Sequence, residues 1–289
     1  MDYRLGKKVR LPAVSVDGAR RRPRTEQVAV EEPLEIRLLA GDERRTLGVT
    51  MRTPGSDFEL AAGFLYGEGV VGAPGDITSI RYCVDPAVDA EQQYNIVNVH
   101  LGRPHLPELP QLERHFYTSS ACGVCGKASL ESIQVRCPQP VAAGQTVTGE
   151  TLSRLPDQLR AEQSLFADTG GVHAAGLFTT DGKLLEVRED VGRHNAVDKL
   201  VGWALLQGRL PLSQCVLMVS GRASYEILQK AVVAGLPVVC SVSAPSSLAV
   251  DVARTFGVTL VGFLRGAKFN IYTGAERIAL GDLTPSPLS

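Results

Sequence analysis

Cys122 and Cys125 lie three positions apart in the glycine-flanked segment TSSACGVCGKAS, residues 118–129. Two cysteines at this spacing can bind a metal, exchange between dithiol and disulfide, or present a reactive thiolate. The chain has six cysteines in 289 residues and no signal-peptide pattern, which argues against the disulfide framework of a small secreted protein. We therefore expect a reducing, cytoplasmic environment in which both thiols are available for chemistry.

The spacing leaves a metal site and a redox pair open as alternatives. A structural zinc site needs four ligands, commonly as two close pairs, and Cys137 with His105 or His115 would have to complete it. A thioredoxin-like pair normally sits between a strand and the helix that it opens, whereas this pair follows a proline-rich connector, residues 103–114.

The residues around the pair favour a third interpretation, a nucleophilic sulfur pair. A free cysteine has a pKa of about 8.5, and a CxxC arrangement can lower it to about 3.5–7.5, which makes the thiolate available at neutral pH. Lys127 adds a positive charge beside the pair. Gly123 and Gly126 leave the backbone free to move and the sulfur atoms uncovered.

Three further segments carry groups that bind anions or aromatic rings. Each follows an apolar, strand-like run, and ligands of open α/β sheets lie beyond such strand ends. Helix caps and surface charge explain each segment taken singly, whereas the three together indicate a phosphorylated ligand that contains a ring. The candidate residues are Ser220, Gly221 and Arg222 after the first run, Ser243, Ser246 and Ser247 after the second, and Phe263, Leu264, Arg265, Gly266, Ala267 and Lys268 after the third.

A dense polar group precedes the first long helix of the second half. The segment EDVGRHNAVDKL brings Asp190, Arg193, His194, Asn195 and Asp198 to a strand-to-helix junction. Helix capping by Asp190 or Asn195, with Arg193 paired to a local carboxylate, explains this group without any catalytic role. A Ser–His–Asp triad is unsupported because no GxSxG elbow accompanies it.

The elements that position these groups fall into two predicted domains. Residues 1–25 contain Arg20, Arg21, Arg22 and Arg24, lack apolar periodicity and are expected to form a poorly ordered tail. Residues 26–150 form a β-rich domain that carries the CxxC loop, with strands over 26–40, 43–53, 77–85 and 94–102 and a helix over 56–70 capped by Ser56.

Residues 151–289 are expected to form an α/β cofactor-binding domain. Apolar runs alternate there with helical patterns, and in the helix over 193–207 the residues Val197, Leu200, Val201, Ala204 and Leu205 share one face. Strands this continuously apolar are buried on both faces, which predicts a sheet between two layers of helices. The fold class is therefore α/β in this half and α+β for the whole chain.

Composition excludes two classes of function. The net charge is −1, so bulk electrostatics does not attract nucleic acid or an anionic membrane. The chain also lacks an uninterrupted apolar run of the ~20 residues that a membrane-spanning helix requires. The arginine cluster is followed by TEQVAVEEPLEI instead of an apolar run, so it is not a twin-arginine export signal.

Five motifs in order resemble the formate dehydrogenase accessory sulfurtransferase (FdhD) family. They are CGVCG, EDVGRHNAVDK, VSGRAS, SAPSSLAV and GFLRGAKFNIYT, and the likeness extends from about residue 28 to residue 278. The resemblance implies a cytoplasmic, homodimeric sulfur carrier that takes sulfur from a cysteine desulfurase and passes it to the molybdenum cofactor before formate dehydrogenase receives that cofactor. The cofactor implied is the bis-molybdopterin guanine dinucleotide form.

The resemblance also assigns residues and a fold. Cys122 corresponds to the persulfide cysteine of the family, Cys125 is the second thiol, and residues 263–268 correspond to its cofactor-binding run. The second domain is expected to resemble the cytidine deaminase fold. Deamination itself is excluded, because His173-Ala174-Ala175 lacks the glutamate of H-x-E and no CxxC follows it. A cofactor- or nucleotide-binding module with a structural zinc loop and a dithiol oxidoreductase are the alternative functions.

Overall fold

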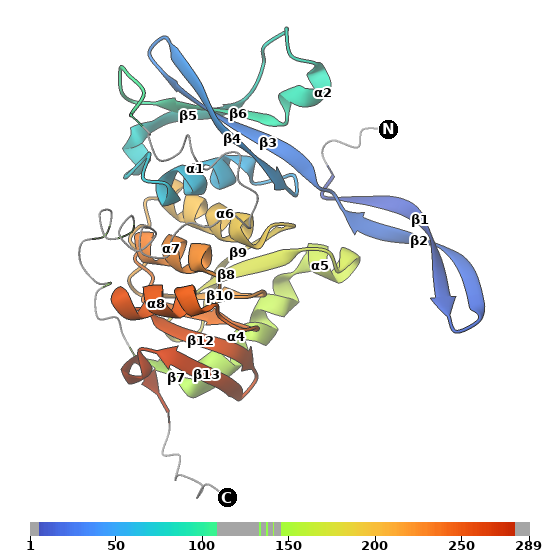
Figure 1. Cartoon of the computed structure of the whole chain (residues 1–289), viewed down its shortest axis with the longest axis vertical. Coiled ribbons are helices and arrows are strands. Elements are labelled where there is room, and N and C mark those ends of the chain that lie inside the picture. The colour runs from blue at the N-terminus through green and yellow to red at the C-terminus, as the bar shows by residue number, and fades with distance from the viewer. Residues whose placement is uncertain (1–5, 109–132, 134–136, 138–140, 142–145, 281–289) are drawn as a thin grey trace, which may run out of the picture. The chain divides into compact units, whose positions relative to one another are not determined.

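The computed structural model describes residues 6–108, 133, 137, 141 and 146–280. Cys122 and Cys125, with the whole CxxC segment, lie outside the described residues. The chain divides into two compact units, and Figure 1 colours the whole chain from blue at the N-terminus to red at the C-terminus. Among described residues, the first unit takes 6–108, 163–174 and 188–209, and the second takes 133, 137, 141, 146–162, 175–187 and 210–280.

This division differs from the single boundary expected near residue 150. Residues 188–209 belong to the first unit because they contain helix α6 (Arg193–Leu206), which packs along helix α1 (Asp57–Gly67). The apolar face of α6 predicts that the helix is buried, and all five residues assigned to that face are buried. Amphipathic periodicity does not reveal which partner a helix packs against, so the partner had to come from the structure.

The first unit is built on a four-stranded sheet. It contains β3 (Glu32–Ala40), β4 (Glu43–Arg52), β5 (Ile77–Tyr82) and β6 (Ile96–Leu101) in the order β4-β3-β6-β5. β3 is antiparallel to β4 and parallel to β6, and β5 is antiparallel to β6. Alternate residues of β3, from Leu34 to Ala40, are buried, as expected of a strand with one face on the core. Short helical segments η1 (Pro74–Asp76) and α2 (Ala90–Gln93) lie between the strands.

Helices α1 and α6 cross with their backbones in direct contact. A Cβ atom on Gly63 would lie 1.9 Å from the Asp198 carbonyl oxygen, and one on Gly202 would lie 1.8 Å from the Glu59 carbonyl oxygen. Only glycine fits at either position. Ser56 precedes α1 but does not cap it with its side chain, contrary to expectation; Ser56 has a φ of 57°, and its carbonyl accepts from the Leu60 amide.

The expected disordered tail is instead a β-hairpin from residue 8 onward. β1 (Lys8–Asp17) and β2 (Arg20–Ala29) pair antiparallel in full register, with Asp17 opposite Arg20. The two-residue turn places Gly18 at φ 58°, a value that glycine adopts without strain. The strands of this hairpin were not predicted because the arginine-rich segment lacks the apolar pattern of a strand, although Asp17-Gly18 is a recognised turn signal. Its base packs against α5 (Ser164–Thr169), where Lys8 forms an ion pair with Asp168.

The second unit is built on a six-stranded sheet in the order β13-β12-β11-β10-β8-β9. The strands are β8 (His173–Thr179), β9 (Leu184–Asp190), β10 (Cys215–Val219), β11 (Val238–Ser241), β12 (Thr259–Arg265) and β13 (Lys268–Thr273). His173–Ala174 and Arg188–Asp190, at the ends of β8 and β9, are grouped with the first unit. β10, β11 and β12 are parallel, and the middle of each is buried.

Helices cover this sheet as the apolar strands predict. Figure 1 draws α7 (Tyr225–Val233) and α8 (Ser247–Thr255) in front of the sheet and α4 (Gly149–Glu162) behind it. α4 was not expected, since it contains Pro156 and follows a linker-like segment, yet Leu152, Leu155 and Leu159 are buried. A short parallel pair, β7 (Val147–Thr148) with β14 (Ile278–Ala279), and η3 (Ala275–Arg277) complete the unit. The likeness to the cytidine deaminase fold stays a prediction.

Across the part of the chain that the structure describes, every helix is too short or too polar to cross a membrane.

Candidate functional site

The three segments expected to bind an anion lie at the ends of three neighbouring parallel strands, and the third begins within β12 at Phe263 and ends at Lys268, the first residue of β13. Val219 at the end of β10 lies opposite Ser241 at the end of β11, and Cys240 lies opposite Val261 of β12. The loops that leave these strands therefore begin along one edge of the sheet. The structure brings Ser220–Arg222, Ser243 and Phe263–Lys268 to this edge, which we call the loop edge, as the sequence predicted.

Backbone hydrogen bonds join the first two loops of the loop edge. The Val242 amide donates to the Val219 carbonyl over 3.3 Å, and the Ser246 amide donates to the Ala223 carbonyl over 3.0 Å. Ala223 and Pro245 form a parallel bridge between the same loops. Ser246 also caps α8, because its hydroxyl accepts from the Ala249 amide, so the structural explanation holds for this serine.

The third loop is held to the second through Ser243. Its carbonyl oxygen accepts from the Phe263 amide over 3.1 Å and from the Ser241 hydroxyl over 2.6 Å. Gly262 permits this approach, since a Cβ atom there would lie 3.0 Å from the Pro245 ring and 3.2 Å from the Ser243 oxygen. Backbone hydrogen bonds therefore connect the three segments of the loop edge to one another.

Phe263 is strained and solvent-exposed at the same time. Its φ is 54°, in the left-handed region that residues with a Cβ rarely adopt, and its side chain is 42% exposed while its neighbour Leu264 is fully buried. This unfavourable backbone conformation leaves the aromatic ring of Phe263 exposed to solvent. Strain of this kind is concentrated at ligand-binding positions.

The first and third segments of the loop edge also carry exposed cations. Arg265 and Lys268 face each other across the turn between β12 and β13, where Gly266 has a φ of 55°. Arg222 is exposed in the first loop. Within the described residues, Arg222, Arg265 and Lys268 have no ion-pair partner. The loop edge therefore combines cations that are available to an anion with an exposed aromatic face.

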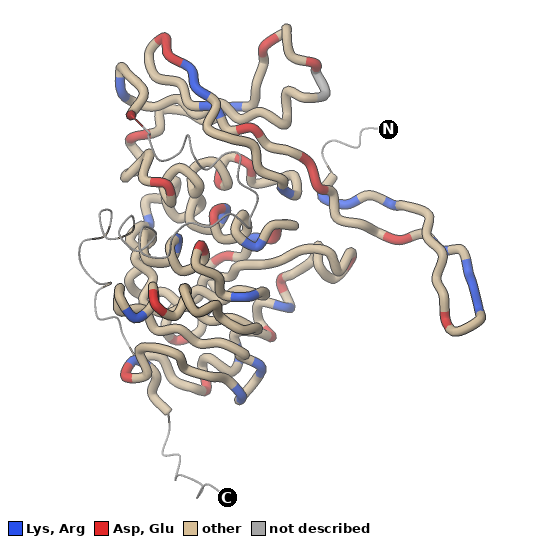
Figure 2. The backbone as a smooth tube through the Cα atoms, viewed as in Figure 1, with Lys and Arg blue, Asp and Glu red and all other residues tan. Residues whose placement is uncertain are grey.

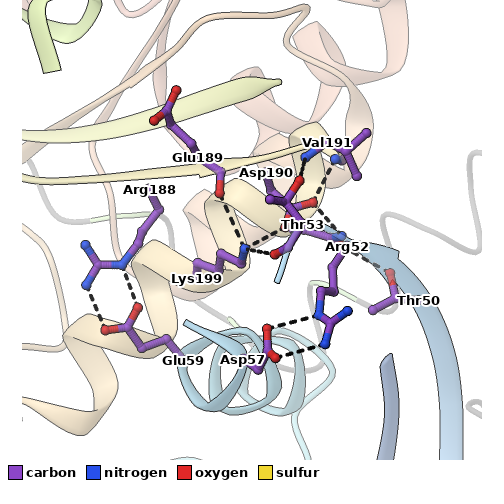
Figure 3. A network of polar contacts seen from close by, with 12 residues as sticks. Thr50, Arg52, Thr53, Asp57, Glu59, Arg188, Glu189, Asp190, Val191 and Lys199 are labelled. Carbon is purple, nitrogen blue, oxygen red and sulfur yellow. Dashed lines mark hydrogen bonds and ion pairs between the residues drawn. The ribbon is translucent and has the colours of Figure 1, made fainter. Parts of the chain in front are cut away.

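The polar group predicted at the start of α6 forms a buried network in the first unit (Figure 3). Asp190 is fully buried and accepts hydrogen bonds from the amides of Thr53 and Gly192 and from the side-chain amide of Asn195. Lys199, 2% exposed, lies 2.7 Å from the Asp190 carboxylate and donates to the Thr53 carbonyl over 2.9 Å. Asp190 and Asn195 are therefore buried structural groups, but neither caps α6 as expected, because the N-cap residue is Gly192 and no described side chain forms a cap hydrogen bond there.

Burial is the largest cause of the pKa shifts of Lys199 and Tyr82 in and beside this network. Removal from water lowers the pKa of Lys199, and the adjacent Asp190 carboxylate opposes that decrease. A second buried pair lies nearby in Figure 3, where the Arg52 guanidinium binds both oxygens of Asp57 at 3.0 and 3.1 Å. Tyr82 donates to the same Asp57 carboxylate, and burial raises the pKa of its hydroxyl.

Sequence reasoning missed Arg52, Thr53 and Lys199. Lys199 had a detectable signal, since it interrupts an otherwise apolar helical region one turn beyond Asn195. Arg52 and Thr53 gave none, because their partners are distant in sequence.

Four cysteines lie within the described residues. Cys83 and Cys240 are buried, and Cys137 and Cys215 are half-buried. Burial raises the pKa of the Cys240 thiol, as expected of a small core residue that takes no part in thiolate chemistry. Among the described residues, no group of three metal-ligating side chains is present, and the zinc alternative for Cys122 and Cys125 lies outside them.

The geometry can be compared with known proteins. The FdhD/NarQ family model matches residues 29–279. A "Sulfur carrier protein FdhD" of Streptomyces coelicolor is 55% identical over 260 residues, covering 89% of this chain and 90% of that protein. The protein of the same name from Mycobacterium tuberculosis is 52% identical over 273 residues, covering 93% of this chain and 97% of the relative.

A solved structure agrees with these relatives. The crystal structure from Desulfotalea psychrophila, described as a formate dehydrogenase accessory protein, matches with a TM-score of 0.73 and 27% identity. The match covers 95% of this chain and all of that chain. Because the family model spans most of the sequence and the relatives match along nearly their full length, the chain belongs to the FdhD/NarQ family.

Proposed function

We propose that this protein is a sulfur carrier that supplies sulfur to the molybdenum cofactor during maturation of formate dehydrogenase. The names of its relatives support the carrier role and the client enzyme. The observation that carries the proposal is the loop edge, which carries the exposed cations Arg222, Arg265 and Lys268 together with the exposed and strained Phe263. An anionic ligand that ends in an aromatic base fits that combination.

The substrate proposed for the loop edge is the guanine-nucleotide end of bis-molybdopterin guanine dinucleotide. Its phosphates are suited to the cations and its base to the face of Phe263, and Ser220, Gly221 and Ser243 contribute backbone or hydroxyl groups beside them. The molybdenum cofactor is cargo in this scheme, bound while sulfur is transferred and then released to the client.

Cys122 is the residue that we propose carries the sulfur, as a persulfide on its side chain. Its thiolate attacks the outer sulfur of a persulfide on a cysteine desulfurase, which forms the Cys122 persulfide and releases the desulfurase thiolate. Cys125 then attacks the inner sulfur, so that a Cys122–Cys125 disulfide forms and hydrosulfide leaves for the metal. A cellular thiol reductant must reduce this disulfide before another cycle. The homodimer and the cytoplasmic location stay predictions.

Mass spectrometry after incubation with a cysteine desulfurase and free cysteine tests the carrier role. We expect one added sulfur that maps to Cys122 and is lost on mild reduction. Cys122→Ala should prevent loading, while Cys125→Ala should load normally and release sulfur more slowly in a single turnover. Absence of the added sulfur from the wild-type protein, with stoichiometric zinc bound instead, would overturn the proposal in favour of a structural zinc loop.

A further inference from the structure

The hairpin of β1 and β2 is a feature that sulfur transfer leaves unexplained. It precedes the region matched by the family model, which begins at residue 29. Its base is attached to the first unit by the Lys8–Asp168 ion pair and by packing of β2 on α5. Every residue from Val16 to Thr25 is exposed. A two-stranded hairpin is marginally stable in water, so an exposed one is suited to binding a partner.

The printed register gives this hairpin two different faces. Ser15 lies opposite Arg22, and Asp17 lies opposite Arg20, so these side chains share one polar face with Arg24. Val14 lies opposite Pro23, and Val16 lies opposite Arg21, on the other face. Val14 and Val16 are each 63% exposed, which is unusual for valine in a strand.

Positive charge is concentrated on the returning strand near the turn (Figure 2). Arg24 is paired with Glu26, whose carboxylate lies 2.7 Å from the Arg24 Nε atom. Arg20, Arg21 and Arg22 have no ion-pair partner within the described residues. Arginine binds carboxylates in a bidentate geometry and is enriched at protein interfaces, whereas three cations alone hold nucleic acid only weakly.

The backbone of the hairpin argues against capture of another strand. A proline within a strand must direct its nitrogen away from the pairing partner, so Pro12 and Pro23 each remove a donor from an outer edge of the ribbon. Charge and proline are the features that protect exposed edges from strand addition. The faces of the hairpin remain available for docking.

We propose that this hairpin is a docking arm for an acidic protein surface that has an apolar centre, carried by the formate dehydrogenase polypeptide. Carboxylates of the partner pair with Arg20, Arg21 and Arg22, and Val14 and Val16 cover the apolar centre. Because Arg20 and Arg22 lie on the face opposite the valines, the partner must hold the hairpin in a groove that contacts both faces, which a flat anionic membrane cannot do. The identity of the partner rests on the proposed function.

Binding of the full chain to purified, cofactor-free formate dehydrogenase tests this arm. We expect about a ten-fold loss of affinity in the variant Arg20→Glu/Arg21→Glu/Arg22→Glu. Its affinity should also depend less steeply on salt concentration than that of the wild type. The matched control is Arg154→Glu/Lys183→Glu/Arg254→Glu, which makes the same charge change at exposed positions of the second unit and should bind as wild type. Val14→Ser/Val16→Ser should lose affinity without changing the salt dependence.

Several outcomes would overturn the proposal. Equal affinity of wild type and the arginine variant would do so, as would an equal loss in the control. Loss of binding to phosphatidylserine vesicles or duplex DNA in the arginine variant, with formate dehydrogenase binding intact, would assign the arm to those ligands instead. Sulfur loading of Cys122 is measured on the same variants, so a failure of the arm is distinguishable from a failure of the carrier function.

Discussion

Asp190 and Lys199 illustrate, at the scale of single residues, how a buried charge depends on its partner. Lys199→Met leaves the Asp190 carboxylate buried without its cation, and we expect the free energy of unfolding to fall by about 3–5 kcal/mol. Asp190→Asn/Lys199→Met removes both charges and should lose less than the single variant. Urea unfolding at neutral pH measures both, and a double variant less stable than Lys199→Met would contradict the argument.

The same pair predicts a pH dependence with a definite sign. Burial already lowers the Lys199 pKa from 10.5, and Asp190→Asn removes the charge that opposes this. Between the lowered folded-state pKa and 10.5, the unfolded chain of that variant holds a proton that the folded chain lacks. Its stability relative to Asp190→Asn/Lys199→Met should therefore increase as pH rises through this window. A difference that is constant with pH would show that Lys199 keeps its proton.

A substitution of Phe263 should weaken ligand binding while it leaves the stability of the protein almost unchanged. Phe263→Gly relieves the left-handed conformation and removes an exposed ring, so we expect the free energy of unfolding to stay within about 1 kcal/mol of wild type. Loss of stacking should weaken binding of guanosine diphosphate about ten-fold. Calorimetry measures both quantities, and Phe263→Tyr is the control that keeps the ring. Unchanged nucleotide affinity in Phe263→Gly would remove this residue from the proposed site.

Prediction from sequence succeeded for the placement of residues that lie at a strand end. Ser220, Ser243 and Phe263 come together because adjacent parallel strands end at one edge, a rule that needs no coordinates. It failed for Arg52, whose partners Asp57 and Asn95 come from a helix and a loop. It also did not foresee the positive φ of Phe263, because that conformation arises from tertiary constraints.

At the scale of elements, the crossing of α1 and α6 sets a strict steric requirement. Gly202→Ala places a methyl group inside the van der Waals radius of the Glu59 carbonyl, and backbone atoms cannot yield as a flexible side chain can. We expect a loss of stability above the ~1–3 kcal/mol of ordinary overpacking. Gly75→Ala is the control, since a Cβ atom there meets nothing within 4 Å. Equal unfolding midpoints of the two variants would refute a tight crossing.

Element existence was predictable wherever hydrophobic periodicity is strong. The strands and helices from β8 to β13 were all expected from the sequence. The inner strands are buried as predicted, whereas the edge strands β9 and β13 are mostly half-buried. The β1–β2 hairpin was missed because four arginines dominate β2, and α4 because Pro156 and its flanking linker resemble loop composition. In both cases the local composition is typical of a loop, whereas packing against the rest of the protein stabilises a strand or a helix.

At the scale of the whole molecule, the two units are interleaved along the chain, which limits where it can be divided. The first unit needs α6, although the segment 188–209 begins 87 positions after Leu101, the last residue of β6. A boundary at residue 150, natural from composition, would separate α1 from the helix that covers it.

This arrangement predicts the behaviour of fragments. A fragment of residues 1–150 lacks α6, whose backbone contacts α1 at Asp198 and Gly202. Loss of this closely packed helix removes a large part of the interior of the first unit, whereas the stability of a whole domain is only about 5–15 kcal/mol. We therefore expect fragment 1–150 alone to show no cooperative urea transition.

Mixing that fragment with residues 151–289 should restore a cooperative transition, because α6 is then available to α1 from the second fragment. Circular dichroism of the separate and mixed fragments measures this, and Gly202→Ala in the second fragment is the control that should prevent recovery. Cooperative unfolding of fragment 1–150 by itself would mean that the four-stranded sheet and α1 form a sufficient core without α6. The sequence-based boundary near residue 150 would then be correct for stability, even though the contacts of α6 cross it.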